Sequence, residues 1–411
     1  MGAVRVSHEV DVTIVGGGMV GASLAVALAP LGLRVAVIES VPHTSADQPS
    51  FDERTTAMSN GSRRVLDTLG LWDGIREQAT PIRRIHVSDR GRFGLARIDA
   101  HEQGLEAIGY VMPNRVLGRA LWARIADLPA LEVFCPARVE SLSMAADHVD
   151  VTVAAGGDRR TLSTRLIVAA DGAQSMVRKA FGVEATVADY HQTAVITTVL
   201  PQQFHQYTAY ERFTSDGPLA LLPMSDGRCT LVLTLSPERA QAAMQESDAQ
   251  FLAEVQARFG FRLGRFLQAG HRSAYPLFLT QSAQTSVGRC VIIGNAAQGL
   301  HPVAGMGFNL GLRDAACLAE LLAETPGESR DCGAPALLAR YDAWRAQDRS
   351  GVIGFTDSLV RVFANPLGVV RHLRDAGLLA FDLLPPAKAA LSRLSTGTAR
   401  ASKLARGVPL R

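Results

Sequence analysis

The feature that most limits the fold is a run of glycines near the start of the chain. Residues 16–21 read Gly-Gly-Gly-Met-Val-Gly and fit the pattern G-x-G-x-x-G. The β-branched run Asp11–Val15 precedes them, and an alanine- and leucine-rich stretch, Met19–Ala29, overlaps them and continues the chain. The strand-like segment Arg34–Glu39 comes next, so the order is strand, helix, strand. This order predicts a parallel sheet with a glycine turn at the start of its first helix.

The spacing of these glycines suits a bound dinucleotide. The first glycine allows a tight turn, the second lets the backbone approach a pyrophosphate, and the third lets helix and strand pack closely. Glu39 ends the second strand, 18 residues after Gly21, where its carboxylate can accept a hydrogen bond from a ribose hydroxyl. An acid here disfavours a 2′-phosphate, so FAD or NAD is expected rather than NADP. The alternative is a structural glycine turn beside a solvated Glu39.

Length and composition bound the remaining possibilities. The chain has 411 residues, 47% hydrophobic and 20% charged, so two or three units with a large core are expected. The net charge is only +3 without a dense basic and aromatic cluster, so nucleic acid is not an expected partner. Five cysteines without CxxC spacing predict reduced thiols in a cytoplasmic protein, with no metal site. Without a secretory signal or 18 consecutive apolar residues, any membrane contact is expected to be peripheral.

Two further predicted strands end in residues suited to binding. Several short β-type runs occupy residues 132–170, with a predicted hairpin turn at Gly156–Gly157 and a final strand that ends in Asp171–Gly172. Asp-Gly alone is a common turn. The apolar strand Cys290–Ile293 then ends in Gly294–Asn295. Two more predicted strands therefore end, like the first one, in residues that can contact a ligand.

A loop rich in proline and glycine follows the last of these strands. It contains Pro302 and the segment Gly305–Asn309, and a helix is predicted to begin near Phe308. Gly305 and Gly307 flank one residue, which allows the backbone to lie against a flat ligand ring. The start of the helix would then face that ring and stabilise negative charge on it.

Together the three motifs resemble the p-hydroxybenzoate hydroxylase superfamily of FAD-dependent aromatic hydroxylases, over most of the chain. On this resemblance the ADP part of FAD contacts Gly16, Gly18, Met19, Gly21 and Glu39. The rest of the cofactor contacts Arg54, Arg115, Asp171, Gly172, Gly294 and Asn295. The flavin-proximal loop consists of Pro302, Gly305, Met306, Gly307, Phe308 and Asn309, with no side chain assigned as acid or base.

The resemblance also implies a monooxygenase reaction. NAD(P)H would reduce FAD, reduced FAD would add O2 at C4a, and the hydroperoxide would deliver one oxygen atom to an electron-rich phenol. Only one G-x-G-x-x-G unit is present. The reductant is therefore expected to dock transiently on the FAD domain, or an external electron-transfer protein replaces it.

A narrower resemblance points to the ubiquinone-biosynthesis branch, above all to its 2-polyprenyl-6-methoxyphenol hydroxylases. It rests on residues 86–91, 211–229 and 272–277. Asn295 and Gln298 replace the Asp and His usual in the superfamily, and both are familiar in this branch. A polyprenylated phenol is the implied substrate, with a ubiquinone-biosynthesis protein complex as a further partner. The expected substrate contacts are Tyr210, Leu219, Leu221 and Pro223.

Other functions stay open at this point. A non-catalytic FAD-bound scaffold of a quinone-biosynthesis complex would keep the glycines without consuming NAD(P)H. An FAD-dependent polyprenyl reductase would need no O2. A flavin halogenase would carry W-x-W-x-I-P, whereas Trp72, Trp122 and Trp344 stand far apart.

The expected fold class is α/β, with a discontinuous Rossmann-like FAD domain, an inserted, mostly antiparallel β substrate domain and a helical C-terminal region. The FAD domain is assigned to residues 1–79, 113–181 and 284–350, the substrate domain to 80–112 and 182–283, and the helical region with its basic tail to 351–411. This last region holds nine cationic and three acidic residues. The tail is therefore expected to contact the inner membrane face or sibling biosynthetic proteins, the alternative being a solvated tail on a core-packed helix.

Overall fold

The structure is a computed structural model in which the placement of most residues can be described. The described residues are 5–45, 48, 50, 54–92, 94–325, 331–364, 401–410 and the single positions Gly377, Ala380, Asp382, Leu384 and Lys388.

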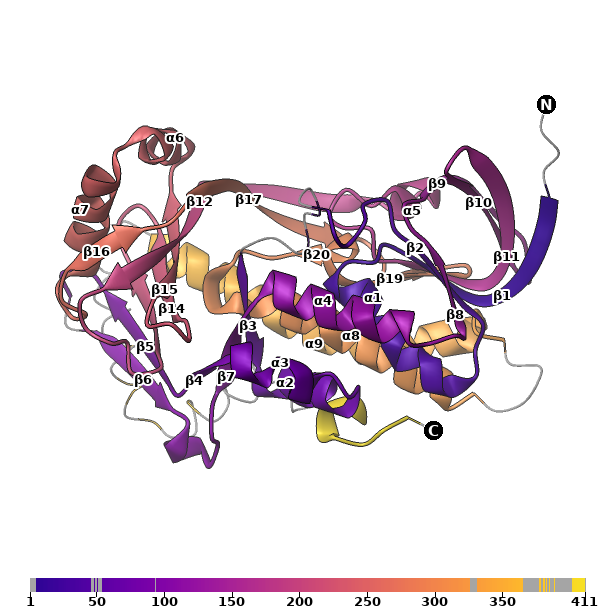
Figure 1. Ribbon diagram of the computed structural model, residues 1–411, viewed down its shortest axis with the longest axis horizontal. Helices are drawn as coiled ribbons and strands as arrows, with labels where there is room; N and C mark the ends of the chain where they lie inside the picture. Colours follow the sequence, from indigo (N-terminus) through magenta and orange to yellow (C-terminus); the bar gives the residue numbers. More distant parts are fainter. Residues whose placement is uncertain are drawn as a thin grey trace.

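A mostly parallel sheet forms one half of the molecule (Figure 1). Its described strands, in spatial order, are β18 (Ser286–Val287), β19 (Cys290–Ile292), β11 (Asp158–Ala169), β1 (Arg5–Val15), β2 (Val35–Ile38) and β8 (Leu131–Phe134). Within this order only β18 is antiparallel to its neighbour. Beyond it, β10 (Val149–Ala155) pairs antiparallel with β11, and β9 (Arg138–Met144) with β10. The short strands β2 and β19 are apolar throughout and fully buried, as expected where both faces of a sheet are covered.

Helices cover one face of this sheet, with α1 packed directly against α4 and α8. The helices of this half are α1 (Met19–Leu28), α2 (Asn60–Thr68), α3 (Trp72–Ile75), α4 (Asn114–Ala126), α5 (Met176–Ala180), α8 (Met306–Ala323) and α9 (Pro335–Ala364). Short 3-10 turns lie at η1 (Ala29–Leu31), η2 (Arg76–Gln78), η4 (Gly294–Ala296), η5 (Val303–Gly305) and η7 (Leu404–Arg406). The opposite face of the sheet is covered by the β9–β10 extension and α5.

A second, mostly antiparallel sheet forms the other half of the molecule. In spatial order its described strands are β20 (Gln298–Gly299), β17 (Ser273–Ser282), β12 (Ala185–Pro201), β15 (Cys229–Leu235), β14 (Pro218–Pro223), β13 (Thr208–Phe213), β5 (Arg84–Asp89) and β6 (Leu95–Asp99), and η3 (His101–Gln103) follows β6. The short strand β16 (Phe266–Ala269) pairs with the end of β12. The helices α6 (Pro237–Gln245) and α7 (Asp248–Phe259) cover one face and enclose a separate core.

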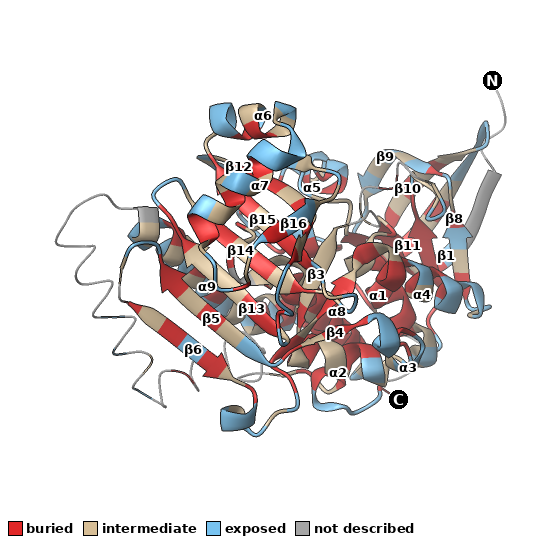
Figure 2. Cartoon of the chain, turned by 60° about the vertical axis from the view of Figure 1, so that its left-hand side comes forward, coloured by how far each residue is buried: buried red, intermediate tan, exposed pale blue. Residues whose placement is uncertain are grey.

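A small sheet lies between the two halves. It consists of β3 (Thr55–Ser59), β7 (Gly109–Pro113) and β4 (Thr80–Ile82) in the order β3-β7-β4. The long strands β12 and β17 also run from one half of the molecule to the other (Figure 1). Buried residues fill both halves, densely in α1 and α8 (Figure 2). The expected α/β fold class is confirmed, while the domain limits stay a prediction.

The last described segment returns to the first half of the molecule. Leu404, Ala405 and Leu410 are buried in the same core as α1 and α8. The Leu404 carbonyl accepts a hydrogen bond from Thr68 Oγ1 on α2 at 3.0 Å, and the Lys403 N–H donates to Glu320 on α8 at 2.6 Å. Residues 401–410 are therefore packed on the core.

The remaining charges of the tail fall into two groups. Where the structure describes them, most are paired: Arg361 with Asp357, Lys388 with Asp382, and Lys403 with Glu324. The cationic residues that lie outside the described residues are Arg371, Arg374, Arg393, Arg400 and Arg411. Among the helices of the described residues, none combines the length and the apolar character that a bilayer span requires.

Candidate functional site

Three strand ends of the parallel sheet, β1, β11 and β19, meet beside the first helix. The glycine loop after β1 is fixed by close packing. Gly16 has a left-handed φ of 104°, and a Cβ added there or at Gly21 would overlap backbone carbonyl oxygens of neighbouring residues. Gly18 differs, since a Cβ there would meet only the Ser50 side chain, at 2.9 Å, within the described residues. Gly16 and Gly21 therefore serve the protein's own packing, and Gly18 leaves space for a ligand.

The start of α1 carries donors that are not used by side chains. Its N-cap, Gly18, forms no side-chain hydrogen bond, and no acid lies in its first turn. Because the first N–H groups of a helix have no partner inside the helix, they are available to an anion. Met19 begins the helix at this point. The residues present therefore fit the pyrophosphate of a dinucleotide.

Glu39 holds the glycine loop from the end of β2. Its Oε2 accepts the Gly17 N–H at 2.6 Å and its Oε1 accepts the Val41 N–H at 2.8 Å. Trp122, on α4, donates its indole N–H to the Gly17 carbonyl at 3.1 Å. The carboxylate is thus oriented by two backbone donors beside the loop. Its contact with a ribose hydroxyl stays a prediction.

Asp171 lies two residues beyond the end of β11, with one carboxylate oxygen hydrogen-bonded and the other without a partner among the described residues. Its Oδ2 accepts the N–H groups of Met176 and Val177 at 2.7 and 3.2 Å. Its Oδ1 is buried and has no hydrogen-bond partner within the described residues. Gly172, with a φ of 85°, leaves open space beside it. A buried acceptor next to open space suits the hydroxyl of a bound cofactor.

Arg178 joins two of the strand ends, and the sequence did not single it out as a site residue. Its Nη1 donates to the Ala296 carbonyl at 2.5 Å and its Nη2 to the Ala173 carbonyl at 3.0 Å. Since Ala173 follows β11 and Ala296 follows β19, one buried guanidinium fixes the distance between the two loops. Hydrogen bonds from a charged donor are the stronger kind.

The loop after β19 is anchored to α8 through Asp314. Gly294 has a φ of 59° and donates its N–H to Asp314 Oδ2 at 3.1 Å. Gln298 donates to the same oxygen at 2.7 Å and Arg345 donates to Oδ1 at 2.7 Å. Gln298 therefore belongs to this interior network. Asn295 is exposed at the turn, where it can reach a ligand.

Asn309 fastens the start of α8 to β3 and α2. Its Nδ2 donates to the carbonyls of Gly305 and Ala57 at 2.7 and 2.8 Å. Its Oδ1 accepts from the Ser59 N–H and the Ser62 hydroxyl, both at 2.7 Å. All four hydrogen bonds lie within the protein. The Asn309 side chain therefore positions the loop.

The rest of the flavin-proximal loop divides into buried and open positions. Met306 is buried with Leu310 and Val352, and Phe308 packs against the main core. A Cβ on Gly307 would meet nothing within 4 Å. The N-cap Gly305 has no side chain that could cap the first N–H groups of α8, and no acid lies in the first turn of this helix. As at α1, unused N–H groups point from a helix start that carries no side-chain cap.

His301, directly before Pro302, is almost fully buried. Its Nδ1 accepts the Val303 N–H at 3.1 Å, so the neutral ring carries its proton on Nε2. Nε2 is buried without a partner among the described residues. Burial lowers the pKa of His301 to about 4. Tyr190 stands edge-on to this ring, with 5.2 Å between the ring centres. Burial, and to a smaller extent the negative charge of Asp357, raise the pKa of Tyr190 to about 12.

Arg54 and Arg115 lie where β3 and α4 begin. The Arg54 guanidinium stacks over the Tyr275 ring, 4.6 Å from the ring centre. The backbone carbonyl of Arg54 accepts the Asn114 N–H at 2.8 Å. Arg115, the next residue of α4, is half-buried. Both therefore occupy the junction between the two halves, and their contact with FAD stays a prediction.

The four expected substrate residues share one face of the second sheet. Leu219 and Leu221 are fully buried in the core under α7, and Tyr210 stands edge-on to Phe259 of that helix at 5.4 Å. Pro223, two residues beyond Leu221 on the same strand, is buried too. These residues thus face α6 and α7.

The opposite face is directed toward the FAD half. On it Ala220 and Leu222 are half-buried, and Leu222 packs with Ala57 of β3. Thr230, which pairs with Leu222, bonds to Thr55 of β3 at 2.9 Å. No signal in the sequence distinguishes the two faces, because either face of an apolar strand can be the covered one.

Comparison with known families identifies the fold's cofactor. A family model described as FAD binding domain matches residues 9–356. The chain belongs to this FAD-binding monooxygenase family. The expectation of a flavin-dependent aromatic hydroxylase is confirmed, whereas the individual cofactor contacts are not tested by this match.

Relatives place the chain in the ubiquinone hydroxylase branch of the family. It is 38% identical over 405 residues to the ubiquinone hydroxylase UbiL of Rhodospirillum rubrum, covering 97% of this chain and 93% of that one. It is 32% identical over 382 residues to the 3-demethoxyubiquinol 3-hydroxylase of Escherichia coli, covering 92% and 95%. The branch predicted from the sequence is confirmed, but no single member is fixed.

Solved structures share the fold. The p-nitrophenol 4-monooxygenase PnpA of Pseudomonas putida superposes with a TM-score of 0.77 at 22% identity, covering 94% of this chain and 97% of that one. PqsL of Pseudomonas aeruginosa, solved with 2-aminobenzoylacetate, gives a TM-score of 0.74 at 22% identity, covering 91% and 100%. At this identity the likeness concerns the fold.

Proposed function

We propose that this flavin-dependent hydroxylase acts on the ring of a polyprenylated phenol in ubiquinone biosynthesis, with NAD(P)H as reductant and O2 as co-substrate. The names of its relatives, which are ubiquinone hydroxylases, support the pathway. The structural observation that carries the proposal is the half-buried face of β14, which is turned toward β3. An apolar surface beside the cofactor half suits an aromatic ring.

Bound FAD would supply the activation of O2 and the transfer of oxygen. The chain holds it through the starts of α1 and α8 and through the Asp171 carboxylate. The N–H groups at the start of α8, within Gly305–Asn309, would face the bound ring and stabilise negative charge on it, as a helix start does for an anion. Arg178 keeps the loops after β11 and β19 at a constant separation. A phenol is already electron-rich, so a strong catalytic base is not required.

The substrate ring is proposed to contact Ala220 and Leu222. It does not reach the four residues expected from the sequence, because they lie on the opposite face of the sheet. Tyr210, Leu219, Leu221 and Pro223 support the strand from its covered side. Replacing Ala220 by Phe would narrow the space at the face and raise the KM for a phenol. The same change at the exposed Val187 serves as a control and should leave the KM unchanged.

Labelled oxygen tests the reaction. The purified FAD-loaded enzyme is incubated with NAD(P)H, a short-chain prenylated methoxyphenol and 18O2. One labelled oxygen on the product ring is expected. Label arriving from water excludes the proposal, product formed without O2 identifies a reductase, and the absence of any NAD(P)H oxidation identifies a scaffold.

Gene deletion addresses the position of hydroxylation. The accumulated quinone precursors, measured by mass spectrometry, should lack one ring oxygen at the position that this enzyme serves. If no precursor that lacks a ring oxygen accumulates, the result would contradict a role in this pathway.

A further inference from the structure

Large apolar side chains are exposed at the end of the second sheet, away from the FAD half. Phe261 is 69% exposed, Leu267 53% and Phe204 50%. They come from the turn after α7, from β16 and from the turn between β12 and β13. Single exposed apolar residues are ordinary, but several on neighbouring loops mark an interaction surface.

Backbone hydrogen bonds hold these loops together. The Gln202 N–H donates to the Arg265 carbonyl at 2.8 Å, and the Gln203 N–H donates to the Leu263 carbonyl at 2.9 Å. Phe204 stands edge-on to Tyr207 at 5.4 Å. The segments that carry these three side chains are therefore joined to one another.

Four exposed arginines lie on or beside the same segments. Arg83 stacks over Tyr207 at 4.6 Å, and its neighbour Arg84 reaches Gln206 at 3.4 Å. Arg262 and Arg265 lie in the turn that follows Phe261. None of the four forms an ion pair with any described residue, while the nearby Asp226 is paired with Arg228. We call Phe204, Phe261, Leu267, Arg83, Arg84, Arg262 and Arg265 the arginine–phenylalanine patch.

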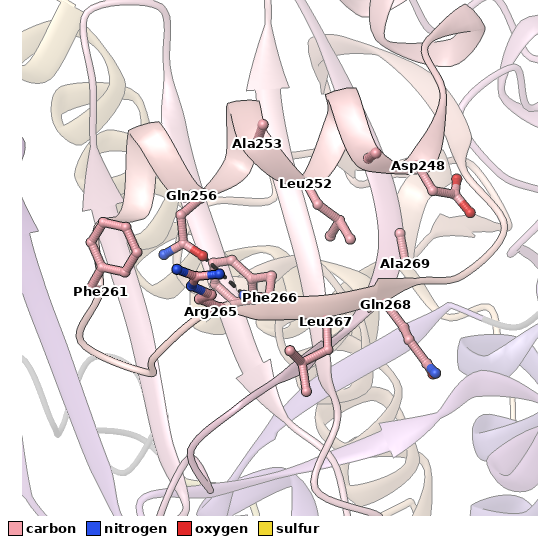
Figure 3. A pocket seen from close by; sticks show the side chains of 11 residues that line it. Asp248, Leu252, Ala253, Gln256, Phe261, Arg265, Phe266, Leu267, Gln268 and Ala269 are labelled. Carbon is pink, nitrogen blue, oxygen red and sulfur yellow. Dashed lines mark hydrogen bonds between the residues drawn. The ribbon is translucent and has the colours of Figure 1, made fainter.

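A groove opens beside this patch, between α7 and β16 (Figure 3). Its volume is about 660 Å³, and Leu252, Phe261, Phe266 and Leu267 are among its lining residues. Figure 3 shows Phe261 and Arg265 at one end of the groove and Asp248 at the other. The groove thus adds apolar surface to the patch.

We propose that the arginine–phenylalanine patch docks on an anionic lipid surface, with Phe204, Phe261 and Leu267 entering the interface. Unpaired positive charge beside exposed apolar side chains matches such a surface, since the cations meet anionic headgroups and the apolar groups leave water. The inference deepens the proposed function, because a polyprenylated phenol dissolves in membranes. The described charges of the C-terminal tail are less suited to this task, since most of them are paired.

Vesicle co-sedimentation of the FAD-loaded, full-length enzyme tests the docking. One set of vesicles is pure phosphatidylcholine, and the other contains about a third phosphatidylglycerol. The variants are Arg262→Gln with Arg265→Gln, and Phe261→Ser with Leu267→Ser. The matched controls are Arg138→Gln with Arg160→Gln, two exposed arginines on the β9–β11 end of the molecule, and the exposed Val187→Ser.

The expected results differ for the two kinds of side chain. Binding of the wild type to anionic vesicles should weaken with added salt. Each arginine near an anionic surface contributes about fivefold, so the double arginine variant should bind roughly 25-fold more weakly. The double apolar variant should lose binding to both kinds of vesicle. Both control variants should bind like the wild type.

Two results would overturn the inference. Patch variants that bind vesicles as well as the wild type show that another surface is used. The second result has two parts: the wild type does not bind vesicles, and the patch variants lose a self-association that the wild type shows in analytical ultracentrifugation. That combination would show that the patch is a protein interface. Hydroxylation of a short-chain, water-soluble phenol is measured in parallel and should be equal in all variants. If the wild type binds vesicles through the patch but hydroxylates no phenol, the proposed function is refuted and the docking inference stands.

Discussion

Replacing Asn309 by Asp tests whether one amide holds the start of α8. The carboxylate keeps the size of the side chain and can still accept from the Ser59 N–H and the Ser62 hydroxyl. The two bonds donated to the carbonyls of Gly305 and Ala57 are lost, because an ionised carboxylate has no proton to give. Two pairs of oxygen atoms then face each other in a largely buried place.

The size of the effect follows from these two bonds. A buried carbonyl left without its donor costs about 1–3 kcal/mol. For two carbonyls, we expect Asn309→Asp to lower the free energy of unfolding by about 2–6 kcal/mol at pH 7. Protonation of the introduced carboxyl restores one donor, which raises its pKa in the folded state above that in the unfolded chain. The loss should therefore be small below about pH 4 and grow as the pH rises.

Urea unfolding of the FAD-loaded proteins, followed by flavin and tryptophan fluorescence, measures this loss. Asn295→Asp is the matched control, since it makes the same chemical change at an exposed turn of the same site. The control should unfold at the urea concentration of the wild type. If Asn309→Asp also unfolds there at pH 7, or if its loss is constant between pH 4 and 8, the amide does not hold the helix start.

Three further changes probe the site. Gly18→Val should keep the fold and lose FAD, and full FAD occupancy in this variant would contradict the prediction. Gly21→Ala should lower the unfolding midpoint even without FAD, because the added Cβ overlaps a backbone carbonyl oxygen. Gly307→Pro removes one N–H from the first turn of α8, where proline is tolerated, so stopped-flow reduction of the flavin should slow; wild-type rates would refute it. Burial lowers the pKa of His301 to about 4, so the wild type should lose up to about 3 kcal/mol of stability as the pH falls from 6.5 to 4. His301→Gln should lack that part of the loss, and identical pH profiles would argue against a buried neutral ring.

The local features of the fold were predictable because their signals lie in neighbouring residues. The glycine pattern at 16–21 predicted the start of α1, and the Gly156–Gly157 pair predicted a hairpin turn. Both of these glycines have a positive φ, between β10 and β11. The apolar run Asp11–Val15 predicted β1 but only its inner half. The outer half pairs with β11 over residues whose sequence is polar, and no apolar run marks it.

Features that depend on distant parts of the chain were not predictable. Leu219 and Leu222 are equally apolar, and only the position of α7 decides which of them faces the core. Arg178 and Asn309 gain their roles from carbonyls 118 and 252 residues away in the chain. A single sequence holds no signal for such pairs.

The contact between α2 and the last described segment has a consequence for biosynthesis of the chain. Thr68 and Leu404 are separated by 336 positions. At a translation rate of roughly 5–20 residues per second, α2 therefore waits about 17–70 seconds for the segment that covers it. During this time the apolar surface that Leu404, Ala405 and Leu410 will later bury stays uncovered. Synthesis of residues 401–410, rather than emergence of the glycine loop, thus sets the earliest moment at which the cofactor half can become fully native.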